Sequence, residues 1–296
     1  EIYTLSLHDA LPIYGHPAVL KQKPEYRLKV EYDDEPINPR KDYDNFAHMA
    51  CWHRNYNLGD EHDFDDPPEL LKQMIRDTLS ADEVIDYVKK SKFDDVRLIY
   101  NRSEREWELQ DEYNGKWFTE YTFTPNELKN SDEAKDCVLE FLSINSLKEL
   151  AERKNIMLPL YLYDHSGITM SCSHTYPYND RWDSGQVGWI YASYNEIGKE
   201  YGTLSADTIE KAETRMIGDV ETYDCYLRGE CYGFIIEKNG EEIDSCWGFL
   251  GDLREVREDM KNYVSDEEKH LFDNIDYCCM EYAENEEYED EDEYDM

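Results

Sequence analysis

Three consecutive residues, Asp164-His165-Ser166, have the side chains that nucleophilic catalysis uses. A Ser–His–Asp triad is assembled in space, however, and three adjacent residues cannot present such a relay to one another. The sequence also lacks the Gly-x-Ser-x-Gly motif of the α/β-hydrolases. Asp, Ser and the following Gly167 are common turn residues, so we interpret the segment first as a turn. A small hydrolase or nuclease that uses Asp164, His165 and Asp183 as acid, base or metal ligands is the alternative hypothesis.

Polar residues also lie at the ends of several expected strands. One group follows an apolar strand expected over 156–163, a second precedes a strand expected over 187–192, and a third lies on a hairpin. If the groups converge, they form one shallow binding site. Otherwise these side chains form hydrogen bonds within turns and to buried backbone groups. The sequence assigns a catalytic role to none of them. The candidate residues are Asp164, His165, Ser166, Asp183, Ser184, Gln186, Asp244 and Cys246.

Two Cys-x-His pairs, Cys51/His53 and Cys172/His174, supply side chains that zinc binds. Neither pair matches the Cys-x₂-Cys or His-x₃-His spacing of zinc sites. A buried thiol beside a surface imidazole explains each pair without a metal. We therefore expect no metal and no cofactor. The four residues remain the weak candidates of a third hypothesis, a metal-stabilised structural protein.

The chain is strongly acidic: 31 Lys and Arg against 69 Asp and Glu give a net charge of −38. Such a surface repels phosphate groups and acidic membranes, so direct binding to nucleic acid or to a membrane is disfavoured. A basic protein is the partner that this charge suits, although high charge also serves solubility alone. The charge does not predict the oligomeric state.

The helices are expected where capping residues precede an apolar stripe. A long helix is expected over 206–228, followed by Gly229 as a stop signal. Other helices are expected to begin at Asp66 before Pro67-Pro68, at Ser146 with Glu149, and at Ser193 with Glu196.

The strands are expected to be antiparallel. Asn114-Gly115 and Asn239-Gly240 are the dipeptides that two-residue hairpin turns favour. Pro159 interrupts the most apolar strand and therefore implies a sheet edge or a bulge. Helices in blocks between hairpins favour an α+β fold, with a mostly antiparallel sheet and hairpins packed against several helices.

The hairpin around Asn239-Gly240 predicts which side chains pack. In a two-residue turn, its apolar residues share one face, and Asp244 and Cys246 point to the other. The apolar face must pack, and if the face with Asp244 and Cys246 is open, a shallow binding site can lie there. The expected apolar face comprises Tyr232, Phe234, Ile236, Ile243 and Trp247.

Four sequence segments combine unusual residue choices in a fixed order: 158–170 (LPLYLYDHSGITM), 182–191 (WDSGQVGWIY), 221–224 (ETYD) and 242–249 (EIDSCWGF). The chain resembles, in these segments, a family of conserved proteins from phages and integrative elements of Gram-positive bacteria. The resemblance covers about half of the chain. A weaker similarity to the same family lies within 44–60. The resemblance implies a mobile-element origin and a cytoplasmic setting in a bacterial host, and it implies no activity.

The charge and the resemblance together give the leading hypothesis. We expect a non-enzymatic accessory protein that binds a host or phage protein, with an acidic DNA mimic of the antirestriction type as its narrower form. The 8 Cys residues are scattered through the chain, which favours reduced thiols in a cytoplasm. No apolar run approaches the roughly 20 residues of a membrane-spanning helix.

The expected domain organisation has three parts. The run 1–13 (EIYTLSLHDALPI) resembles the translation of a sequencing adapter and is expected not to be native. A single α+β domain is expected over 24–275, with an insertion at about 91–145, where the resemblance stops. The segment 276–296 is expected to be a disordered acidic tail, because it is rich in carboxylates and contains no Lys or Arg.

Overall fold

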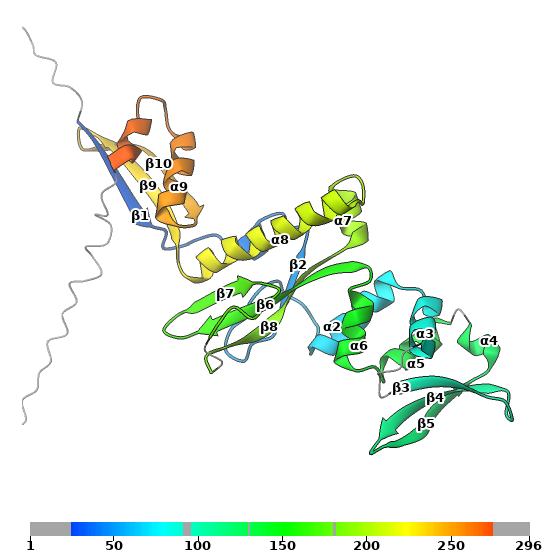
Figure 1. Ribbon diagram of the computed structural model, residues 1–296. Helices are drawn as coiled ribbons and strands as arrows, with labels where there is room; N and C mark the ends of the chain where they lie inside the picture. Colours follow the sequence, from blue (N-terminus) through cyan, green and yellow to red (C-terminus); the bar gives the residue numbers. More distant parts are fainter. Residues whose placement is uncertain (1–24, 91–95, 130, 180–181, 275–296) are drawn as a thin grey trace, which may run out of the picture. The chain divides into compact units, whose positions relative to one another are not determined.

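The computed structural model describes residues 25–90, 96–129, 131–179 and 182–274 (Figure 1). Three antiparallel sheets and nine α-helices lie within these ranges, which confirms the α+β class. The adapter-like run 1–13 and the acidic tail 276–296 lie outside the described residues. The strands are β1 (Tyr26–Tyr32), β2 (His48–Cys51), β3 (Val96–Asn101), β4 (Glu106–Tyr113), β5 (Lys116–Phe123), β6 (Asn155–Asp164), β7 (Ile168–Cys172), β8 (Ser184–Ser193), β9 (Cys231–Lys238) and β10 (Glu241–Leu250). The helices are α1 (Pro39–Asp42), α2 (Pro67–Thr78), α3 (Ala81–Lys90), α4 (Pro125–Leu128), α5 (Asp132–Leu139), α6 (Ile144–Ala151), α7 (Tyr194–Glu200), α8 (Ala206–Leu227) and α9 (Leu253–Met260).

The chain divides into two compact units, where the sequence predicted a single domain over 24–275. Of the described residues, one unit contains 25–31, 233–247 and 257–274, and it is built on the sheet β1-β9-β10. The other contains 32–232, apart from the gaps, and 248–256. The insertion expected at about 91–145 belongs to this larger unit, where it forms the sheet β3-β4-β5 together with α4 and α5.

The four-stranded sheet of the larger unit has the order β2-β8-β6-β7. Pro159 of β6 pairs with Trp189 of β8, whereas the pairing of β6 with β7 begins only at Leu160. The missing N–H of Pro159 therefore costs no bond on the β7 side. The register with β8 shifts just beyond, between Leu160 and Tyr161. Both features agree with the edge or bulge that Pro159 predicted.

The two faces of this sheet are buried in different ways. Leu160 and Leu162 point to one face and pack in a core with Met216 and Val220 of α8. Met157, which points to the opposite face, joins a second core with residues of α2 and α6. Because side chains alternate along a strand, Tyr161 and Tyr163 share the face of Met157.

The segment 33–66 contains α1 and the edge strand β2. A buried ion pair holds it together: the Arg40 guanidinium, whose side chain is only 1% exposed, donates to both oxygens of Asp60 at 2.8 and 3.0 Å. Arg40 also donates to Asn45 and to the carbonyl of Ala47. Asp60 in turn accepts from the backbone N–H of Met49, so the free edge of β2 is closed by this loop.

Helix α8 also contacts β7, the strand at the opposite edge of the sheet. Asp224 Oδ1 accepts a hydrogen bond from the backbone N–H of Met170 in β7. One residue earlier, the hydroxyl of Tyr223 accepts from the backbone N–H of Gly59 in the loop beside β2. The two residues belong to one of the segments that resemble the phage family. Their hydrogen bonds connect α8 to both edges of the sheet.

Most of the predicted helix starts are confirmed. Asp66 caps α2, and Ser193 with Glu196 forms the capping box of α7. The start predicted at Ser146 is wrong, because α6 begins one turn earlier with Ser143 as N-cap. The Ser143 hydroxyl accepts from the backbone N–H of Ser146, which is therefore buried inside the first turn.

The hairpin β9–β10 turns at Asn239-Gly240 as predicted, but its packing face differs. Tyr232, Phe234 and Ile236 are buried, and Phe234 packs edge-to-face on Phe272. Ile243 and Trp247 are instead 45% and 44% exposed. A Cβ at Gly233 would lie 2.1 Å from the Trp247 ring, so this indole covers Gly233 on the open face. The side chains of Asp244 and Cys246 therefore do not line the open face, and the predicted five-residue apolar face is wrong.

Candidate functional site

The tip of β6 and the start of β8 bring six of the eight candidate polar residues together. The backbone N–H of Asp164 donates to the carbonyl of Asp183 at 2.7 Å. His165 Nδ1 lies 3.0 Å from Asp183 Oδ2, and in the β6–β8 ladder Tyr163 pairs with Ser184. The six residues are Asp164, His165, Ser166, Asp183, Ser184 and Gln186.

His165 and Asp183 form a base with an orienting carboxylate. An Nδ1–H that donates to Asp183 leaves Nε2 with its lone pair directed away from the pair. The two side chains are 62% and 40% exposed, so the site does not exclude water. Ser166 lies in the turn with φ of 57°, and the hydroxyl of Ser184 is hydrogen-bonded to that of Tyr176. The geometry provides the His–Asp pair of a catalytic triad, in a site that is open to water.

Four tyrosines beside this turn form a connected group of rings, which we call the tyrosine end: Tyr161, Tyr163, Tyr176 and Tyr178. Tyr163 stacks on Tyr178 with centroids 5.4 Å apart. Tyr176 is nearly perpendicular to both Tyr161 and Tyr178, at 82° and 86°. Burial raises the pKa of Tyr178 to about 12, so its hydroxyl stays protonated and donates to the carbonyl of Thr169. The four rings thus form one connected aromatic group at this end of the sheet.

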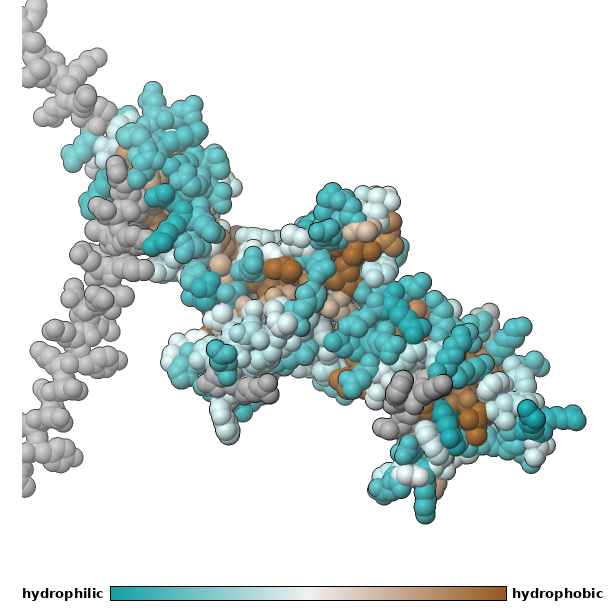
Figure 2. Space-filling view, in the orientation of Figure 1, coloured by the Kyte–Doolittle hydropathy of each residue, from teal (hydrophilic) through white to brown (hydrophobic). Residues whose placement is uncertain are grey.

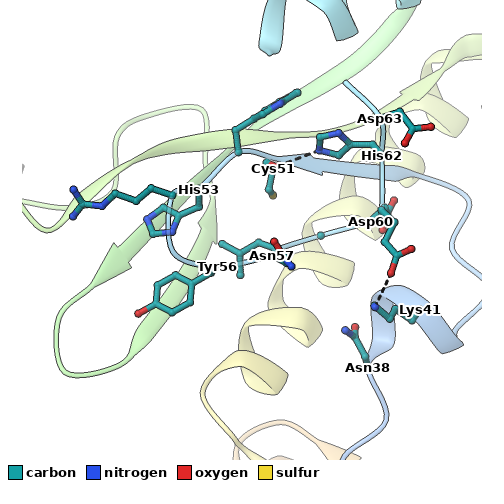
Figure 3. A pocket seen from close by; sticks show the side chains of 14 residues that line it. Asn38, Lys41, Cys51, His53, Tyr56, Asn57, Asp60, His62 and Asp63 are labelled. Carbon is teal, nitrogen blue, oxygen red and sulfur yellow. Dashed lines mark hydrogen bonds and ion pairs between the residues drawn. The ribbon is translucent and has the colours of Figure 1, made fainter. Parts of the chain in front are cut away.

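A cavity of about 970 Å³ adjoins this region and was missed by the sequence reasoning (Figure 3). It is lined by α1 and by the loop after β2, from Cys51 to Asp63. Tyr56 of this loop donates its hydroxyl hydrogen to Asp164 Oδ1 at 3.2 Å, which connects the cavity wall to the tip of β6. That bond is also the main cause that raises the pKa of Tyr56. The weak likeness within 44–60 and the Cys51/His53 pair were the sequence signals for this loop.

The polar groups of the cavity wall are only partly paired. Lys41 forms an ion pair with Glu61 at 2.8 Å, and His53 stacks on Tyr56 with centroids 5.0 Å apart. His62 Nε2 donates to the carbonyl of Cys51 (Figure 3). His62 Nδ1 is buried and, within the part of the chain that the structure describes, has no hydrogen-bond partner. The cavity wall therefore contains acidic, basic and aromatic side chains, as recognition surfaces do.

The four weak metal candidates lie in different environments. Burial raises the pKa of the Cys51 thiol to about 12 and that of Cys172 to about 11, which disfavours the thiolate that a metal binds. His174 Nε2 lies 2.8 Å from Glu213. Among the described residues, no three His, Cys, Asp or Glu side chains lie where they could share a metal ion.

Asp244 and Cys246 of β10 belong to the smaller unit, apart from the six other candidates. No protein-family model, curated protein or solved structure matches the chain. In the described ranges, no helix is both long enough and apolar enough to cross a membrane.

Proposed function

We propose that this chain is a non-enzymatic accessory protein of a phage or other mobile element that binds a basic segment of a host or phage protein at the tyrosine end. One observation carries the proposal: the tyrosine rings lie on and beside a sheet whose strands β2, β6, β7 and β8 contain no Lys or Arg. The faces of aromatic rings attract the cations of Lys and Arg side chains. Asp164 and Asp183 add negative charge at the edge of the same group.

The charge of the whole chain supports the same partner. Hydrophilic side chains cover most of the face seen in Figure 2, and the net charge is −38. A field of this sign accelerates the encounter with a basic protein and repels acidic ones. A cytoplasmic location in a bacterial host is part of this proposal.

The openness of the polar site favours binding over catalysis. Catalytic bases commonly work where water is excluded, because electrostatic interactions are stronger there. The His165–Asp183 pair is largely exposed. The pairing itself favours a second candidate function, a hydrolase with His165 as general base.

An array of peptides of equal length and differing charge tests the proposal. We expect basic peptides to bind at low ionic strength, to be released by salt, and to outcompete neutral and acidic ones. No binding of basic peptides at low ionic strength would contradict the proposal. For the narrower hypothesis of DNA mimicry, a captured partner must also release the chain when duplex DNA is added, because mimic and DNA share one surface.

A further inference from the structure

The chain contains two Asn-Gly dipeptides, and both occupy hairpin turns. Asn114-Gly115 turns the β4–β5 hairpin of the larger unit, and Asn239-Gly240 turns the β9–β10 hairpin of the smaller one. All four residues have positive φ, of 53° and 75° in the first turn and 56° and 87° in the second. The two turns therefore share a sequence and a backbone conformation, and they differ in what contacts them.

An asparagine that precedes a glycine can react with its own backbone. The backbone nitrogen of the glycine attacks the carboxamide carbon of the asparagine, and a new C–N bond closes an imide ring. The NH₂ group of the carboxamide leaves as ammonia together with the proton of the glycine N–H. Water then adds to either carbonyl carbon of the ring and opens it, which gives aspartate or isoaspartate. The reaction requires no reactant other than water.

The conformation of both turns holds the reacting atoms apart. Ring closure requires the asparagine Cβ and the glycine nitrogen to lie on the same side of the Cα–C bond, whereas the left-handed conformation places them nearly opposite each other. The turn must therefore open locally before the ring can form. Contacts that hold the asparagine in place slow the reaction, because they raise the free-energy cost of this opening.

The turn at Asn239 is held by the residue that precedes β1. The backbone N–H of Asn239 donates to the carbonyl of Glu25 at 2.8 Å, and its side-chain Oδ1 accepts from the Glu25 N–H at 3.1 Å. The ammonium of Lys238, next to the turn, lies 4.9 Å from the centre of the Tyr26 ring. The backbone and the carboxamide of Asn239 are thus both bonded to a neighbouring segment of the sheet.

The turn at Asn114 lacks such contacts. Among the described residues, neither the backbone N–H nor the carboxamide of Asn114 has a hydrogen-bond partner, and the β4–β5 ladder ends at the pair before the turn. A Cβ added to Gly115 would meet no atom within 4 Å, and Tyr113 is 70% exposed. The edge strand β5 that follows is mostly exposed as well. This turn therefore opens at a lower cost than the turn at Asn239.

We propose that Asn114 is a site of spontaneous deamidation and that the two hydrogen bonds to Glu25 protect Asn239 from the same reaction. Either product adds one negative charge to the tip of the β4–β5 hairpin. Isoaspartate also lengthens the main chain by one carbon, which does not fit a two-residue turn. The modification therefore changes both the charge and the conformation of this tip.

Peptide mapping by mass spectrometry measures the reaction at both turns in one sample. The full chain is incubated at mildly alkaline pH and digested at intervals, and the fraction of each Asn-Gly peptide converted to aspartate and isoaspartate is followed. We expect Asn114 to react about thirtyfold faster than Asn239 in the folded chain, which is the effect of two hydrogen bonds of ordinary strength on the local opening.

The same incubation in guanidinium chloride is the control, because both turns are then unfolded and their rates should become similar. In the folded chain, Asn114→Ser should abolish most of the gradual acidic shift seen by isoelectric focusing, and the matched variant Asn239→Ser should not. Equal rates at the two turns of the folded chain, or a faster reaction at Asn239, would overturn the proposal. So would an unreacted Asn114 in the folded chain under conditions that convert it in the denaturant.

Discussion

His165 and Asp183, which lie eighteen positions apart, are joined by a hydrogen bond of 3.0 Å between Nδ1 and Oδ2. The bond closes the gap between the tip of β6 and the start of β8, beside the backbone bond from Asp164 to Asp183. It orients the imidazole as a catalytic dyad would, but both side chains are largely exposed. In the proposed binding function, this pair contributes to the shape and the charge at the edge of the tyrosine end.

The His165→Ala variant tests the catalytic alternative. The proposed function predicts no ester- or phosphodiester-hydrolysing activity that depends on His165, because the site is open to water. The unfolding midpoint should stay close to that of the wild type, since the side chain is 62% exposed. Wild-type activity on a panel of such substrates that disappears in a folded His165→Ala variant would favour the hydrolase.

Arg40→Ala should be strongly destabilising. Its removal leaves Asp60 without the buried guanidinium and opens the segment that closes the edge of β2, so we expect the free energy of unfolding to fall by about 3–5 kcal/mol. Lys41→Ala is the matched control, because Lys41 forms an exposed ion pair with Glu61 and should leave the urea midpoint unchanged. Similar urea midpoints for the two variants would show that the Arg40 network does not stabilise the fold.

Gly233→Ala should destabilise the smaller unit. The new Cβ would lie 2.1 Å from the Trp247 ring, and overpacking of this kind costs about 1–3 kcal/mol. In the double variant with Trp247→Ala the added methyl group has space, so most of this cost should be recovered. Equal costs of Gly233→Ala with and without the indole, measured by urea unfolding, would contradict the packing of Trp247 on Gly233.

The His48–Glu196 pair predicts a defined pH dependence. The hydrogen bond from His48 lowers the pKa of Glu196 to about 2, and the same bond raises the pKa of His48 from 6.5. The Glu196 contribution to stability is present above its unfolded pKa near 4.5 and is lost as the pH falls toward 2. The His48 contribution is present below 6.5 and is lost as the pH rises through the raised value.

The titration of His48 by NMR measures this coupling directly. We expect its pKa to lie above 6.5 in the wild type and to fall in Glu196→Gln. Both side chains are partly exposed, at 50% and 35%, so the energy involved should stay below about 1 kcal/mol. A His48 pKa that is unchanged by Glu196→Gln would contradict the assigned cause.

Local sequence signals predicted much of the fold. Asp66 and Ser193 cap helices because their side chains satisfy the first backbone N–H groups, which depends only on neighbouring residues. Asn114-Gly115 and Asn239-Gly240 turn with positive φ at both positions, as two-residue hairpins require. Ser143 rather than Ser146 caps α6, because its hydroxyl accepts from the backbone N–H of Ser146, whereas the capping-box pattern pointed to Ser146 with Glu149.

Long-range pairing could not be read from the sequence. The pairing of β2 with β8 joins segments about 140 residues apart, and the ion pair that supports β2 buries an arginine, which composition rules place at the surface. The open face of β10 was mispredicted because Trp247 packs on Gly233 rather than in a core. Six candidate site residues did converge, since they occupy the facing ends of two paired strands, but the adjacent cavity depends on the fold of 38–63.

The affinity of a basic peptide for the Tyr163→Ala variant tests the central claim most directly. Tyr163 stacks on Tyr178 and also contacts the ring of His165, whereas Tyr113, at the tip of the β4–β5 hairpin, is 70% exposed and serves as the control. With a labelled peptide and fluorescence anisotropy at low salt, Tyr163→Ala should weaken binding about tenfold and Tyr113→Ala should not. Wild-type affinity in a folded Tyr163→Ala variant would contradict the proposal that the tyrosine end is the binding surface.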